Sequence, residues 1–286
     1  MQQHPLAALF GSGHTPQFAP VVGVGMAREM INRRSFGNYH LLLAHDTLKR
    51  PAEYGHIYQT IRLRHPHTFI IMDNSIIEEG VPRTPKELAL AAKTVIADCV
   101  VLPDMIDDAH KTVQMAEEFA PELREYLVEY SPWTKLLGVC QGRTEDEVFE
   151  CAKQLLSIEH VNFLAVPRGL TKNLKSRVRI TQRIGTLGAP IHLLGFSDDF
   201  HDDLTAATSS PAVMGIDSAV PIRWGLDGKV LACDGTVSPR RPDWLEIDAQ
   251  WTPQVGANLQ WVRHFLSTGN PVSPDQLDDI NFRSRK

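Results

Sequence analysis

Short apolar runs alternate along the chain with longer segments in which apolar residues recur at helical spacing. Because the runs are continuous instead of alternating with polar residues, they predict strands that are buried on both faces of a sheet. Seven such runs occur, at residues 39–44, 68–72, 99–102, 135–140, 161–166, 191–195 and 213–216. The segments between them predict crossover helices at residues 84–97, 108–130, 144–158, 173–186 and 200–209.

Regular alternation of strands and helices is typical of a parallel sheet. The seven repeats favour an α/β fold of the closed (β/α)8 TIM-like barrel type over an open doubly wound sheet. We expect the eighth strand between Lys229 and Ile247 and a terminal helix at residues 258–266. Gly23-Val24-Gly25 precedes the first predicted strand, and no glycine-rich phosphate loop follows it, which disfavours a dinucleotide site.

Two of the predicted helices begin with a capping-box pattern. Thr84 and Thr144 each precede an apolar helical segment and are followed three residues later by a glutamate, Glu87 and Glu147. In this pattern the Thr side chain and the Glu side chain each accept a hydrogen bond from a backbone N–H at the helix start. The starts of these two helices are therefore well specified.

The length of 286 residues suits one barrel domain over residues 1–286, with a core at about 36–266 and short terminal extensions. With 43% hydrophobic and 22% charged residues, the chain can bury a sizeable core. A net charge of −5 offers no general attraction to nucleic acid or anionic lipid, so any such contact requires local basic patches. The chain shows neither a signal-like N-terminus nor a bilayer-spanning apolar stretch, so we expect a soluble, cytoplasmic protein without a membrane partner.

The cysteine and histidine residues do not form a recognisable metal motif. The four cysteines are scattered without a C-x-x-C pair, so we expect no zinc subdomain and no cofactor. The histidines lack partners at metal-ligand spacing, and capping or core roles are favoured for them. These include His40, His45, His192 and His201.

Acidic residues follow three of the predicted strands directly, at Asp73, Asp104 and Asp217. Because the C-terminal ends of parallel barrel strands converge on one mouth, we expect these carboxylates to share a site. Each Asp could instead cap the following helix, but three together favour chemistry. Carboxylates grouped with Gln141 and Arg223 supply a nucleophile, a proton carrier and hydrogen-bonding groups, which suits displacement at a sugar carbon.

The strand-end motifs, over roughly residues 68–225, resemble the tRNA-guanine transglycosylase superfamily. Gly138-Val139-Cys140-Gln141-Gly142 is similar to its Gly-x-x-Gln-Gly motif, and the segment from Asp217 to Arg223 is similar to its Asp-x-x-x-Pro-x-Arg motif. Weaker likenesses occur at Met72-Asp73-Asn74-Ser75, Val101-Leu102-Pro103-Asp104 and Leu194-Gly195-Phe196. Ser75 and Ile76 replace paired glycines of the family, Pro167-Arg168-Gly169-Leu170 departs from its Gly-Gly-Leu, and its C-terminal zinc motif is missing. The chain is most similar to the DNA 7-deazaguanine transglycosylase (DpdA-like) branch of phages and bacteria.

The resemblance implies a set of roles at the barrel mouth. Asp217 is expected to be the nucleophile at C1′ of the target nucleoside, and Asp73 the general acid/base. Arg223 is expected to hold a phosphate or to orient Asp217. Base binding is expected from Asp104, Gln141, Gly142 and Arg168, and backbone contacts from Lys172, Lys175 and Arg177.

The implied function is exchange of guanine in a nucleic acid for a free 7-deazaguanine base of the preQ0 type. DNA is favoured over tRNA because the chain is short and lacks the zinc motif. One alternative is a tRNA-guanine transglycosylase relative without the zinc subdomain, and another is a catalytically silent barrel that binds nucleic acid. The presence of both Asp73 and Asp217 argues against the silent barrel.

Overall fold

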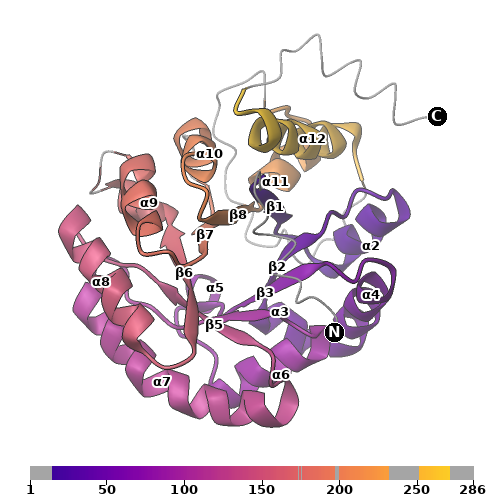
Figure 1. Cartoon of the computed structure of the whole chain (residues 1–286). Coiled ribbons are helices and arrows are strands. Elements are labelled where there is room, and N and C mark those ends of the chain that lie inside the picture. Colours follow the sequence, from indigo (N-terminus) through magenta and orange to yellow (C-terminus); the bar gives the residue numbers. More distant parts are fainter. Residues whose placement is uncertain (1–14, 173, 175, 197–199, 232–250, 271–286) are drawn as a thin grey trace.

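The computed structural model describes residues 15–172, 174, 176–196, 200–231 and 251–270, and its framework is one eight-stranded parallel sheet (Figure 1). Each strand pairs with neighbours in the order β1-β8-β7-β6-β5-β4-β3-β2, and the two edge strands, β1 and β2, lie next to each other. The sheet thus forms a nearly closed barrel, which confirms the predicted fold class. The strands are β1 (Gln17–Pro20), β2 (Tyr39–Leu43), β3 (Phe69–Asp73), β4 (Cys99–Val101), β5 (Lys135–Val139), β6 (Val161–Pro167), β7 (Ile191–Leu194) and β8 (Val213–Ser218).

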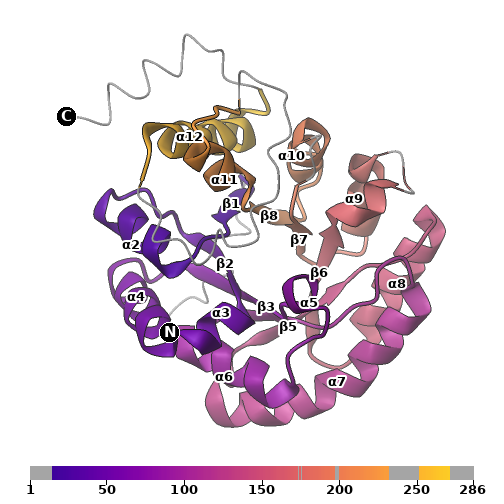
Figure 2. The same ribbon diagram turned by 180° about the vertical axis from the view of Figure 1, so that it is seen from behind.

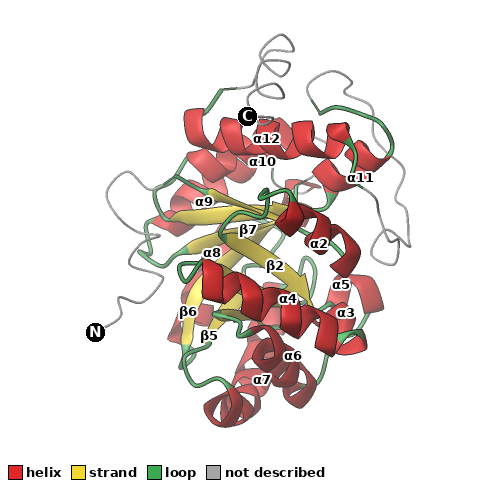
Figure 3. Cartoon of the chain, turned by 90° about the vertical axis from the view of Figure 1, so that its right-hand side faces the viewer, coloured by secondary structure: helices red, strands yellow, loops and turns green. Residues whose placement is uncertain are grey.

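Helices surround the barrel on its outer side (Figure 3). None of the described helices combines the length and the apolar character that crossing a lipid bilayer requires. The helices are α2 (Val24–Asn32), α3 (Ala44–Lys49), α4 (Pro51–Arg64), α5 (Ile76–Glu79), α6 (Pro85–Val95), α7 (Ala109–Tyr130), α8 (Glu145–Ser157), α9 (Arg177–Gly185), α10 (Phe200–Thr208), α11 (Val220–Leu226) and α12 (Pro253–Thr268), with a 3₁₀ helix at Arg168–Lys172.

The eighth strand does not come from the predicted segment. The strand that completes the sheet is β1, which pairs with β8 and precedes every strand predicted from the sequence. Residues 229–231 form no strand, and residues 232–250 of the predicted segment lie outside the described residues. The barrel therefore begins at Gln17 instead of near residue 36, and Gly23-Val24-Gly25 follows the first strand. The signal is weak because β1 has only four residues, Gln-Phe-Ala-Pro, of which only Phe18 is strongly suited to a strand.

Apolar side chains fill both faces of the sheet, which explains why the strands are continuous apolar runs. One buried cluster lines the barrel interior, and a larger one lies between the strands and the helices. In the interior the Tyr39 and Phe69 rings stack with centroids 5.7 Å apart. Gly215 makes room for this stack, because a Cβ there would lie 2.7 Å from Cε1 of Tyr39. The filled interior leaves the ends of the strands as the places for a site.

The two predicted helix starts differ in detail. At α6 the full capping box is present, with Thr84 and Glu87 each accepting from the other's backbone N–H. At α8 the Thr144 hydroxyl accepts from Glu147 N at 3.2 Å, but the Glu147 side chain accepts from Arg143 N instead of from Thr144 N. Both starts are thus capped where expected.

Candidate active site

Asp217 lies near the C-terminal end of β8, and its carboxylate is held through one oxygen. Asp217 is 7% exposed. Oδ1 accepts a hydrogen bond from Gly195 N at 2.9 Å and lies 3.0 Å from Nε2 of His192. Both partners belong to the neighbouring strand β7 and the residue after it. Neither partner engages Oδ2, so the carboxylate is anchored at one oxygen and offers the other.

His192 is a site residue that the sequence analysis did not identify. Its side chain lies in β7, is fully buried, and contacts Asp217 through Nε2 and the Tyr39 hydroxyl through Nδ1 at 2.8 Å. The expected core location of His192 is therefore right, but its polar partners were missed. The available signal was a polar ring inside a buried apolar run, since such a group needs hydrogen-bond partners.

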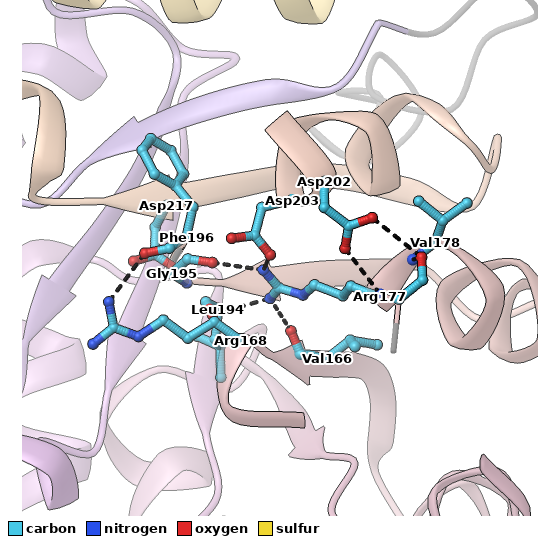
Figure 4. A network of polar contacts seen from close by, with 11 residues as sticks. Val166, Arg168, Arg177, Val178, Leu194, Gly195, Phe196, Asp202, Asp203 and Asp217 are labelled. Atoms are coloured by element: carbon cyan, nitrogen blue, oxygen red, sulfur yellow. Dashed lines mark hydrogen bonds and ion pairs between the residues drawn. The ribbon is translucent and has the colours of Figure 1, made fainter. Parts of the chain in front are cut away.

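The Gly195 peptide is fixed from its other side by a buried ion pair (Figure 4). Arg177 donates to Gly195 O at 2.6 Å, to Leu194 O at 3.0 Å and to Val166 O. Its guanidinium also pairs with Asp203 at 2.9 Å, and both side chains are completely buried. Arg177 thus ties the ends of β6 and β7 to α10, next to the Gly195 N–H that contacts Asp217.

This burial overturns one of the predicted nucleic-acid contacts. Arg177 cannot reach a phosphate, because its guanidinium is surrounded by carbonyl groups and by Asp203. The error has a physical reason: sequence proximity to Lys172 and Lys175 suggested a basic surface, whereas Arg177 is on the inner face of α9. The side chain of Lys172 and all of Lys175 lie outside the described residues, so those two contacts stay predictions.

Asp73 ends β3 on the opposite part of the barrel mouth. Its Oδ1 accepts from Ser75 N at 2.7 Å, and Ser75 has a left-handed backbone with φ of 63°. Burial raises the pKa of Asp73 well above its ordinary value, and the charges of Glu78, Asp217 and Asp104 add to this effect, which the Ser75 N–H only partly opposes. A neutral carboxyl group at this place can donate a proton.

Asp104 and Gln141 lie against each other at the ends of the next strands. Nε2 of Gln141 donates to Oδ2 of Asp104 at 2.6 Å, and Oε1 of Gln141 accepts from Asp107 N at 3.3 Å. Burial raises the pKa of Asp104 to about 6, against the lowering effect of the Gln141 bond. The structure thus brings together two residues of the predicted base-binding set.

Close packing against α8 requires a glycine at position 142. A Cβ at this position would lie 2.8 Å from both Cβ of Glu147 and N of Val148, in the first turns of α8. The absent side chain therefore lets the β5 end pass close to α8, whether or not a ligand also approaches it. The expected contact between Gly142 N–H and a base stays a prediction.

The two predicted arginines occupy different places. Arg168 donates from Nη1 to Phe196 O at 3.0 Å, and its Cδ would be 3.2 Å from a Cβ on Gly195, so it borders the loop that contacts Asp217. Figure 4 shows its guanidinium beside that loop. Arg223 lies on α11 after β8, and its proposed phosphate or orienting role stays a prediction. The donors found at Asp217 are instead His192 and Gly195.

The mouth is covered in this structure. Seen from the face opposite to that of Figure 1, the short helix α5 lies across the barrel opening (Figure 2). Asp104 and Asp217 are 9% and 7% exposed. Two cavities, of about 290 and 400 Å³, lie away from these carboxylates, the first beside α7 and the second lined by His45, Leu48, Lys49, Glu79 and Arg83. The side chains of Asp104 and Asp217 are therefore largely shielded from solvent.

Comparisons with known protein families and curated proteins found no match to this chain. Among the described residues, no three His, Cys, Asp or Glu side chains are grouped so as to hold a metal ion. The expected membership of the transglycosylase superfamily stays a prediction.

Proposed function

We propose that this protein exchanges guanine in a nucleic acid, preferably DNA, for a free 7-deazaguanine base of the preQ0 type. The observation that carries the proposal is the pairing of unlike carboxyl groups at one barrel mouth. Asp217 is held through Oδ1 by His192 and Gly195, neither of which engages Oδ2, while the pKa of Asp73 is raised by burial. One group suits nucleophilic attack and the other suits proton transfer.

In the first half of the proposed reaction, Oδ2 of Asp217 attacks C1′ of the target nucleoside. The bond between C1′ and the base nitrogen breaks, and its electron pair leaves with guanine. Asp73 donates its proton to that base, so guanine departs neutral and Asp73 becomes a carboxylate. The product is an ester between Asp217 and the sugar, formed through an oxocarbenium-like state.

The second half reverses these steps with a different base. Asp73 takes the ring N–H proton of the incoming 7-deazaguanine, whose nitrogen then attacks C1′ and releases the Asp217 carboxylate. Two displacements at one carbon restore the original configuration. Asp73 regains its proton, so the cycle consumes no cofactor and is balanced in protons.

Base selection is proposed for the Asp104–Gln141 pair. With a pKa of about 6, Asp104 is mostly ionised at neutral pH, and its oxygens can accept from the ring N–H and the exocyclic amino group of guanine. Adenine cannot present that pair of donors. Gln141 already holds Oδ2 of Asp104 at 2.6 Å, which keeps the carboxylate in one orientation.

The nucleic-acid substrate must present an unstacked nucleotide, because Asp104 and Asp217 are buried and Asp73 is half-buried. DNA is proposed over tRNA because no Cys/His zinc motif occurs within these 286 residues. Three of the four cysteines, Cys99, Cys140 and Cys151, are free and buried at separate places in the barrel wall and helices. A relative of the tRNA enzymes without the zinc subdomain is the second candidate.

The test is incorporation of radiolabelled guanine or 7-deazaguanine into duplex DNA, single-stranded DNA and tRNA. Asp217→Asn is the matched control, because its side-chain oxygen can still accept from Gly195 N and its amide is a poor nucleophile. We expect exchange into DNA, its loss by at least about 10³-fold in this variant, and a covalent nucleic-acid adduct in the wild type only. Exchange that survives Asp217→Asn would refute the assignment, exchange into tRNA alone would favour the second candidate, and binding without exchange would favour a silent barrel.

A further inference from the structure

We propose that Tyr39 and His192 form a positioning relay that orients the nucleophilic carboxylate of Asp217. The catalytic role of this relay rests on the proposed function. The contacts that form it are observed in the barrel interior and do not depend on that function. The Tyr39 hydroxyl lies 2.8 Å from Nδ1 of His192, and Nε2 of His192 lies 3.0 Å from Oδ1 of Asp217. The three residues come from β2, β7 and β8.

The contacts assign a direction to the relay. Burial raises the pKa of Tyr39 well above its ordinary value, with further contributions from Cys99 and Asp217, so its hydroxyl keeps a proton to donate. When that proton is donated to Nδ1, the imidazole carries its own proton on Nε2. Nε2–H then donates to Asp217, and every polar hydrogen in the chain is directed toward the carboxylate.

Full burial makes this arrangement specific. Tyr39 and His192 are both 0% exposed, so protein groups must satisfy the polar atoms of the imidazole. The Tyr39 ring is itself confined, because it stacks on Phe69 and packs against Gly215, where a Cβ would lie 2.7 Å from its Cε1. The hydroxyl is therefore held at Nδ1 by ring packing, and the imidazole has little freedom to turn away from Asp217.

The relay has a consequence for the proposed chemistry. Gly195 N–H and His192 anchor the same oxygen, Oδ1, so the carboxylate plane is fixed and Oδ2 is the atom left to attack. These two donors orient the carboxylate before the sugar arrives. In the proposed ester, Oδ1 is the carbonyl oxygen and accepts the same two bonds, so the relay fits both states of the cycle.

The test compares variants by kcat and KM in the exchange assay. Tyr39→Phe removes only the hydroxyl, and we expect kcat to fall about 10-fold with KM for the base unchanged. His192→Leu removes the donor and should lower kcat about 100-fold, whereas His192→Gln, which offers an amide donor, should recover part of it. Tyr54→Phe is the matched control, because the buried Tyr54 hydroxyl also donates to a carboxylate, Asp46, which has no part in the proposed reaction. It should leave kcat unchanged.

A second measurement does not depend on catalysis. Nitrogen-15 NMR of the imidazoles should show His192 protonated on Nε2, and Tyr39→Phe should shift its tautomer populations. This keeps the relay testable if His192→Leu does not fold. Protonation of His192 on Nδ1, or wild-type kcat in both Tyr39→Phe and His192→Leu while Asp217→Asn is inactive, would overturn the relay alone. Absence of exchange in the wild-type protein would overturn the proposed function, and with it the catalytic meaning of the relay.

Discussion

The two sides of the barrel mouth hold their carboxyl groups in different ways. On the β7–β8 side, Asp217 accepts from residues 22 and 25 positions away in the sequence, and both donors are themselves held by buried groups. On the β3 side, Asp73 accepts from the backbone of Ser75, two residues further on. A carboxylate built into the framework suits a nucleophile, whereas one held by its own loop, with a raised pKa, suits a group that gains and loses a proton.

The segments that follow the strands also differ between the two sides, in exposure and in hydrogen bonding. The segments after β3 and β4 carry large apolar side chains that are exposed, whereas Phe196 and Gly195 after β7 accept hydrogen bonds from Arg168 and Arg177. The exposed residues are Ile77, Val81, Met105 and Ile106. On the β3 side, α5 lies in front of the strands (Figure 2). The described residues after β7 are thus held by hydrogen bonds from two arginines, and those after β3 and β4 are more exposed.

The largest effect is expected from the proton carrier. Asp73→Asn keeps the size of the side chain and an acceptor for Ser75 N, but it removes the acid that protonates the leaving base. We expect kcat for guanine exchange to fall 10²–10⁴-fold, roughly the usual contribution of general acid–base catalysis. Steady-state exchange assays would measure it. The effect should shrink for a leaving base that is itself more acidic, and a loss below tenfold would exclude Asp73 as the proton carrier.

The β7–β8 side of the mouth can be tested through the buried ion pair between Arg177 and Asp203. Arg177→Met removes the cation that pairs with the buried Asp203 and three bonds to carbonyl groups, so we expect a loss of about 3–5 kcal/mol in the free energy of unfolding. Urea unfolding would measure it. Arg179→Met is the control two residues away, because Arg179 pairs with Glu145 at the surface and should cost at most about 1 kcal/mol. Equal losses in the two variants would contradict the buried location of Arg177.

The raised pKa of Asp104 predicts that the free energy of unfolding depends on pH. Folding raises the pKa of Asp104 from 3.8 to about 6, so the folded protein retains a proton that the unfolded chain releases first. Its stabilising contribution is therefore present below about pH 4 and is lost as the pH rises through 6, by about 3 kcal/mol. Urea unfolding between pH 4 and 7 should show this decline in the wild type in excess of that in Asp104→Asn. Parallel curves for the two proteins would contradict the raised pKa.

The smallest effect is expected in the loop after β3. Ser75→Gly relieves the left-handed backbone at φ of 63° but removes the hydroxyl that accepts from His45 N at 3.1 Å. These effects oppose each other, so the free energy of unfolding should change by less than about 1 kcal/mol. Ser75→Val adds a β-branched side chain at the same angle and should cost more than about 2 kcal/mol. Equal unfolding midpoints in urea for the two variants would contradict the left-handed turn.

Much of the barrel was predictable because its signals are local. Seven strands lie within two residues of their predicted bounds, since burial on both faces leaves a continuous apolar run in each. The positions of Asp73, Asp104 and Asp217 at strand ends follow from the same pattern. The strand β1 was missed because its four residues carry too little of that pattern, and only pairing with β8 makes it part of the sheet.

The sequence by itself determined the repeating strand–helix order and the residues that end the strands, because backbone propensity and burial act over a few neighbouring residues. Only the tertiary structure decided which polar groups meet. Arg177 was expected at the surface and is buried against Asp203, and His192 was expected in the core without its partners Tyr39 and Asp217. Those contacts join residues separated by up to 153 positions in the sequence, and closure of the barrel brings Tyr39, His192 and Asp217 within hydrogen-bonding distance.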